Sequence, residues 1–199
     1  MSAGFALREI SSCSVRTRVA VSPAAKPVSS RPAAAPEAIA GAAAVAAAVS
    51  GGIGGASAAQ AATLGIRAAE LGQRRGDWIA GAVVARRIAW AVGLMDPDDH
   101  DGSVRDIVEL IGTSLATQES VPAAFAVLAL HPDDPWQACL TAASLGGDSD
   151  TIAAMAGAIA GACHGMDGWP ADAVRTVLEI NNLDLDLVAE KLLALRAGP

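Results

Sequence analysis

Aromatic residues are scarce in this chain of 199 residues, which contains no Tyr, two Phe and four Trp. Hydrophobic residues nevertheless make up 52% of the sequence, and Ala together with 20 Gly supplies much of that fraction. Sheets favour β-branched and aromatic side chains, whereas a core of small side chains suits helices that pack closely. The shortage of aromatics therefore argues against a sheet and predicts an all-α protein.

The chain also lacks a continuous apolar run long enough to cross a membrane. Its most apolar segment, residues 38–49, is mostly Ala and falls short of the roughly 20 residues that a bilayer requires. Cysteine is rare, and Cys13, Cys139 and Cys163 have neither the spacing of a metal site nor that of a disulfide framework. We therefore expect no membrane segment and a reducing, cytoplasmic location.

Basic residues are outnumbered, since 14 Lys and Arg stand against 21 Asp and Glu and the formal net charge is −7. This excess of acid excludes a nucleic-acid binder that works through a basic surface. Residues 1–95 hold ten bases and four acids, whereas residues 96–199 hold four bases and seventeen acids. An acid-rich half can serve solubility alone or contribute to a cation site, and composition leaves both possibilities open.

Two regions differ in composition. Residues 1–35 are rich in Ser, Pro and Arg and contain a single acid, Glu9, so we predict a disordered leader there. Residues 36–199 form the predicted helical domain. Its expected helices are marked by Pro, by Ser and Asp caps and by Gly stops, and cover residues 36–50, 57–71, 77–95, 103–112, 120–131, 134–145, 150–165, 171–179 and 185–196.

Three boundary signals matter below. Gly51 and Gly52 are expected to end the first helix, and Ser57 with Gln60 forms a capping box for the second. The helix after residue 119 is expected to open at Ser120 and Pro122.

The most informative segment is Gly146-Gly147-Asp148-Ser149-Asp150-Thr151. Two glycines free the backbone for a tight turn, and two carboxylates and a hydroxyl follow at the start of a helix. Mg²⁺ and Mn²⁺ prefer oxygen ligands of this kind. Asp near a helix N-terminus is also the usual cap, so the residues alone allow either a metal site or a capped helix.

The helix that follows is almost free of charge and contains Gly157 and Gly161 on one face. Small residues at that spacing let a second helix approach closely, which predicts a central helix. A central helix would hold Asp148 and Asp150 rigidly at its N-terminal end.

At these residues a family resemblance becomes specific. Residues 144–170, SLGGDSDTIAAMAGAIAGACHGMDGWP, resemble the C-terminal signature of the ADP-ribosylglycohydrolase family, with Ser149 in place of the usual Thr. Residues 119–130, ESVPAAFAVLAL, resemble the preceding family helix, and the likeness extends over about residues 38–196. It implies an orthogonal helical bundle, a site for two Mg²⁺ or Mn²⁺ ions, and cleavage of the glycosidic bond of ADP-ribosylated proteins or small ADP-ribose conjugates.

The resemblance also implies residue roles. Asp148, Asp150 and Thr151 take the places of family metal ligands, and Glu119 and Ser120 lie where the family approaches its substrate, although helix capping is the favoured role of that pair. No catalytic residue is assigned. The family's second ligand motif, of the (S/T)-D-D-T type, is absent before residue 95, so we expect an N-terminally truncated, partial domain with half of the ligand set.

Three functional hypotheses follow. The first is a metal-dependent ADP-ribosyl hydrolase of low or no activity. The second is a non-catalytic helical module that binds a nucleotide or a partner, and the third is a truncated product that folds poorly. The chain has no Ser-His-Asp order and no Gly-rich phosphate loop with the strand and Lys such a loop requires.

Overall fold

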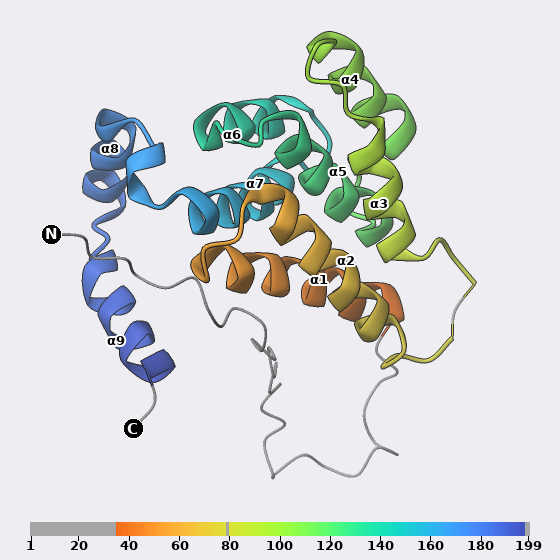
Figure 1. The fold of residues 1–199 in the computed structure, drawn as a ribbon. Coiled ribbons are helices and arrows are strands. Elements are labelled where there is room, and N and C mark those ends of the chain that lie inside the picture. Colours follow the sequence, from red (N-terminus) through yellow and green to blue (C-terminus); the bar gives the residue numbers. More distant parts are fainter. Residues whose placement is uncertain (1–34, 79, 198–199) are drawn as a thin grey trace, which may run out of the picture. The chain divides into compact units, whose positions relative to one another are not determined.

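The computed structural model describes residues 35–78 and 80–197, and all regular secondary structure in those ranges is helical. The elements are α1 (Pro36–Ile53), α2 (Ala58–Gln73), α3 (Val84–Leu94), α4 (His100–Asp106), the π-helical η2 (Ile107–Ile111), α5 (Thr117–Leu130), α6 (Pro135–Ser144), α7 (Ser149–His164), the 3-10 helix η3 (Met166–Gly168), α8 (Ala171–Asn181) and α9 (Leu185–Ala197) (Figure 1). The predicted all-α class is confirmed. The predicted leader, residues 1–35, lies outside the described residues except for Ala35.

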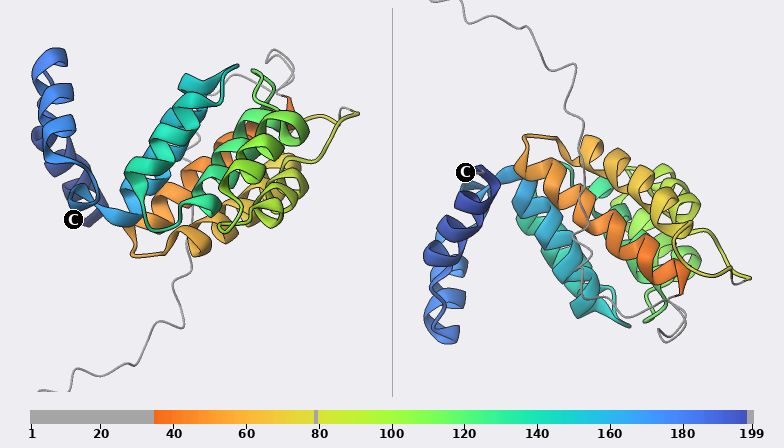
Figure 2. Two further views of the ribbon diagram at one scale, coloured as in Figure 1. Left: turned by 90° about the horizontal axis from the view of Figure 1, so that it is seen from above. Right: turned by 90° about the horizontal axis from the view of Figure 1, so that it is seen from below.

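Small side chains dominate the core, as the composition predicts. α1 and α2 form an antiparallel pair in which Gly65 of α2 faces the carbonyl oxygen of Ala44 and the ring of Phe125. Phe125 is the largest fully buried side chain and belongs to α5, which contacts α1, α3, α6 and α7. Figure 2 shows α5 and α7 among the helices of this bundle. α1 is long and apolar enough to cross a membrane, but its Ala40, Ala44 and Ala48 are fully buried against neighbouring helices.

The first helix does not end at Gly51 and Gly52, as the sequence suggested, but continues to Ile53. A Cβ added at Gly52 would lie 2.9 Å from the Cβ and carbonyl carbon of Ala162 and from the nitrogen of Cys163. Gly52 is therefore the point where the C-terminal ends of α1 and α7 meet. Close packing between distant segments, rather than helix termination, explains this glycine.

We predict that Gly52→Ala destabilises the fold by about 1–2 kcal/mol, because overpacking against the α7 backbone outweighs the gain in helix propensity. Gly51→Ala is the matched control: its Cβ would meet the terminal Cδ1 of Leu64, which can rotate away. Urea unfolding should show Gly51→Ala as neutral or stabilising. Equal effects of the two substitutions would contradict the assigned role of Gly52.

α5 begins at Thr117, earlier than predicted, and Pro122 lies inside it rather than at its start. The helix therefore contains a residue that cannot donate to the carbonyl of Gln118. α3 also differs: it begins at Val84, and Asp77 caps no helix there. In contrast, the capping box of Ser57 and Gln60 is confirmed by both of its hydrogen bonds.

α7 packs closely on α6, as Gly157 predicts. A Cβ at Gly157 would lie 2.8 Å from the Sγ of Cys139 in α6, and Gly161 faces the ring of Trp169. α7 also contacts α1, α2 and α5, which confirms it as a central helix. Its N-terminal end, where Asp148 and Asp150 lie, is thus held by packing on several sides.

Candidate metal and substrate site

The connection between α6 and α7 reverses the chain within four residues. Gly146 and Gly147 adopt φ angles of 76° and 64°, in the left-handed region that favours glycine. α7 then begins at Ser149, with Asp148 at the N-cap position. The glycine pair predicted from the sequence therefore makes the turn that brings both aspartates to the start of α7.

The turn is fixed by the loop before α5, residues 112–116, which we call the 112–116 loop. The backbone N–H of Asp148 donates to the carbonyl oxygen of Thr113 over 2.7 Å. A Cβ at Gly147 would lie 2.2 Å from that oxygen and 2.6 Å from the Oγ1 of Thr113. Only glycine fits at position 147, because the 112–116 loop occupies the space a side chain would need.

Asp148 does not cap the helix it precedes. Its side chain accepts no bond from the α7 backbone; instead Oδ1 accepts from the Oγ1 of Thr151 over 2.9 Å. Asp99 and Asp134, at the same position of α4 and α6, do accept from Gly102 and Gln137. The capping alternative, which the sequence left open, does not describe Asp148.

The candidate metal ligands lie where an ion could reach them. Asp148 is half-buried, and Asp150 and Thr151 are exposed. The hydroxyl of Thr151 gives its hydrogen to Asp148, which leaves its oxygen lone pairs free to bind a cation. Two carboxylates and a hydroxyl are the hard oxygen donors that Mg²⁺ and Mn²⁺ prefer.

These three donors supply only part of the ligand set of one divalent ion, and they are too few to hold two ions. Nowhere in residues 35–78 and 80–197 do three His, Cys, Asp or Glu side chains form a group that could hold a metal. Mg²⁺ commonly keeps several waters and uses only one or two carboxylates, so the set suits a single, weakly bound, hydrated ion.

Glu119 lies on the other side of the 112–116 loop, in the first turn of α5. Its Oε2 accepts from the backbone N–H of Ser114 over 3.1 Å. Hydrogen bonding to Ser114, helped by the positive charge of Arg87, lowers the pKa of the Glu119 carboxyl. Ser120 is buried, and its hydroxyl donates to the carbonyl of Ala116 over 3.3 Å.

The 112–116 loop thus joins the two groups of residues that the sequence singled out. Ser114 holds the carboxylate of Glu119, and the adjacent Thr113 holds the backbone of Asp148. Sequence reasoning missed Thr113, because its role rests on a backbone carbonyl that any residue could supply. It also missed Arg87 of α3, which donates to the carbonyls of Ile111 and Gln118 on either side of the loop.

The lowered pKa of Glu119 predicts a pH dependence of stability. The folded chain favours the ionised carboxylate, so its contribution is complete above the ordinary carboxyl pKa and is lost as the pH falls through the lower folded value. Glu119→Gln should therefore flatten the fall in unfolding free energy between about pH 5 and pH 3, measured by urea titration at each pH. Parallel curves for the wild type and the variant would contradict the bond to Ser114.

The all-helical fold agrees with the resemblance that residues 144–170 carry. The family model described as ADP-ribosylglycohydrolase matches residues 25–199, most of the chain. The chain therefore belongs to the ADP-ribosylglycohydrolase family, which confirms the resemblance seen in the sequence.

Individual relatives match over shorter stretches. YegU of Escherichia coli is 34% identical over 112 residues, which are 56% of this chain and 34% of YegU. The ADP-ribosylhydrolase ARH3 of Homo sapiens is 43% identical over 75 residues, 33% of this chain and 21% of that protein. ARH3 of Danio rerio is 41% identical over 83 residues, 37% of this chain and 22% of its own length. The chain thus spans about a third or less of these relatives, and no solved structure matches it.

Proposed function

We propose that Asp148, Asp150 and Thr151 bind one Mg²⁺ or Mn²⁺ ion at the start of α7. The observation that carries the proposal is the carboxylate of Asp148, which stands at an N-cap position without capping and is bonded to Thr151 instead. A half-buried carboxylate held in this way is preorganised for a cation. Family membership supports a metal, because the family is generally metal-dependent.

We further propose that the substrate is an ADP-ribosylated protein or a small ADP-ribose conjugate, whose glycosidic bond is hydrolysed. Water adds to the ribose carbon, the bond to the acceptor breaks, and the acceptor leaves with a proton. A divalent ion at this position would orient ribose hydroxyls and water and would balance charge at the reacting centre. Asp148 and Asp150 hold that ion, and Glu119, kept ionised by Ser114, accepts a hydrogen bond from the substrate.

A second function is favoured by the incomplete ligand set. With two carboxylates and a hydroxyl in the described part of the chain, the domain would retain weak ion binding and act as a non-catalytic module that binds a nucleotide or a partner. Both readings share the metal site and differ in turnover. A cytoplasmic location remains a prediction.

Release of ADP-ribose separates these functions. The chain is incubated with protein ADP-ribosylated on serine or arginine, with Mn²⁺ or with EDTA, and free ADP-ribose is measured. Mn²⁺-dependent release that disappears in Asp148→Asn with Asp150→Asn would support the hydrolase. No release, together with Mn²⁺-dependent binding of ADP-ribose by calorimetry, would support the non-catalytic module. Release that EDTA leaves unchanged would contradict the proposal.

A further inference from the structure

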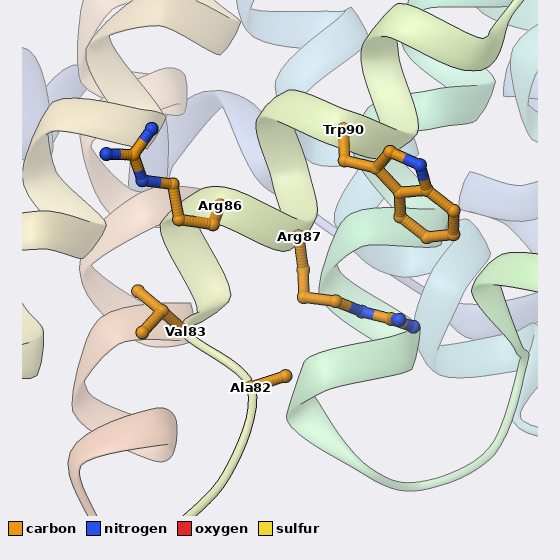
Figure 3. Close-up of a pocket in the computed structure, with 5 residues that line it drawn as sticks. All are labelled: Ala82, Val83, Arg86, Arg87 and Trp90. Carbon is orange, nitrogen blue, oxygen red and sulfur yellow. The ribbon is translucent and has the colours of Figure 1, made fainter.

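The side chain of Arg87 crosses from α3 to the two ends of the 112–116 loop. Its Nε donates to the carbonyl of Gln118 over 2.9 Å, and its Nη2 donates to the carbonyl of Ile111. The guanidinium lies 5.0 Å from the ring centre of Trp90, one helical turn further along α3. Figure 3 shows Arg87 and Trp90 together on one side of α3, while Arg86 extends in a different direction.

Both carbonyls lack their ordinary helical partner. The carbonyl of Gln118 would accept from residue 122, which is Pro122 and has no N–H. Ile111 is the last residue of η2, so no following turn of helix donates to it. A planar guanidinium with several fixed donors can satisfy two such acceptors at once, which an ammonium group cannot do in the same geometry.

These bonds act on the candidate site through the loop between them. Ile111 and Gln118 flank the 112–116 loop, whose Thr113 accepts from the backbone of Asp148 and whose Ser114 donates to Glu119. Fixing both ends of a five-residue loop restricts the positions of Thr113 and Ser114. The side-chain hydrogen bonds of Arg87 go to Gln118 and Ile111, and none goes to Asp148, Asp150 or Thr151.

We propose that Arg87 is a positioning residue for the metal site: it clamps the 112–116 loop, and the loop fixes the turn that carries Asp148. The part that concerns metal binding rests on the function proposed above. Pro122 and Arg87 are complementary, since the proline leaves the carbonyl of Gln118 without a helical donor and the arginine donates to it.

Amide hydrogen exchange without metal tests the clamp directly. In Arg87→Ala we expect the amides of Ser114 and Asp148 to exchange about tenfold faster or more, because losing charge-assisted bonds raises the population of the open loop. Amides in α1 and α2 should keep their rates. Arg86→Ala is the matched control, since it removes the same charge from the adjacent, exposed position and should leave Ser114 and Asp148 unchanged.

Mn²⁺ titration then tests the link to the site. Arg87→Ala should bind Mn²⁺ about tenfold more weakly than Arg86→Ala, a size typical of lost support for metal ligands. Unchanged exchange at Ser114 and Asp148 would overturn the clamp. Faster exchange with unchanged Mn²⁺ affinity would overturn its role in positioning the site. A wild-type chain that binds no Mn²⁺ would overturn the proposed function, and the exchange rates would still decide whether Arg87 clamps the loop.

If Arg87→Ala does not fold, Arg87→Lys replaces it. Lysine keeps the positive charge near Glu119 but can satisfy only one carbonyl well, so exchange at Asp148 should still accelerate. Exchange rates equal to those of the wild type would show that charge alone, and not the paired bonds, is what matters, and would overturn the proposal.

Discussion

Replacing Asp148 and Asp150 by Asn is expected to weaken Mn²⁺ binding by about 100-fold or more, because affinity for hard cations depends strongly on the number of charged ligands. The two amides keep the size and one oxygen of each carboxylate while removing both charges. Free Mn²⁺ measured by electron paramagnetic resonance during titration reports the change. Stability should alter little, since Asp148 makes no capping bond that Asn would lose.

Asp98→Asn with Asp99→Asn is the matched control. It also neutralises two acids at the start of a helix and changes the net charge equally, but Asp99 is a genuine cap that accepts from Gly102. Asn caps helices about as well as Asp, so α4 should persist. Mn²⁺ affinity should remain that of the wild type. Equal losses in the two double variants would mean that general charge attraction, not a site, binds the ion.

Gly147→Ala is expected to destabilise the fold by about 3 kcal/mol, the sum of a left-handed backbone and a lost backbone hydrogen bond. The new Cβ would lie 2.2 Å from the carbonyl oxygen of Thr113, which accepts from Asp148. Either the 112–116 loop or the turn must move, and the Thr113–Asp148 bond breaks in both cases. Urea unfolding measures the loss, and Mn²⁺ affinity should fall with it.

Gly146→Ala separates the two causes. Gly146 also has a positive φ, but nothing lies within 4 Å of a Cβ added there. The free energy of unfolding of Gly146→Ala should fall only by the cost of a left-handed backbone at alanine, about 1–2 kcal/mol, and Mn²⁺ binding should be retained. Losses of equal size at positions 146 and 147 would show that the contact with Thr113 has no energetic importance.

Local signals in the sequence predicted most of the helices. The capping box at Ser57 is present, because it depends on residues within three positions of one another. The last two helices lie within two residues of their predicted bounds.

Boundaries that depend on distant contacts were predicted wrongly. The sequence predicts a helix stop at Gly52, but the missing side chain of this residue allows a contact with α7, more than a hundred residues later. The sequence predicts a helix start near Pro122, but α5 already begins at Thr117, and Arg87 satisfies the carbonyl that the proline leaves free. Propensities within one segment contain no information about such partners.

The candidate site shows the same division. The pattern at Gly146–Thr151 could be recognised from the sequence because its turn, carboxylates and hydroxyl are consecutive. The residues that hold this turn in place could not be recognised from the sequence, since Thr113 acts through a backbone oxygen and Arg87 belongs to another helix.

The most direct test of the metal site is the position at which Mn²⁺ broadens the amide resonances of the ¹⁵N-labelled full chain. At substoichiometric Mn²⁺, the account predicts that residues 146–151 and the adjacent Thr113 and Ser114 lose intensity first. The α4 start around Asp98 to Asp101 contains three aspartates, one more than residues 146–151, and should nevertheless lose intensity only later. Broadening that begins at α4, or that spreads evenly over the acidic half of the chain, would contradict a site at the start of α7.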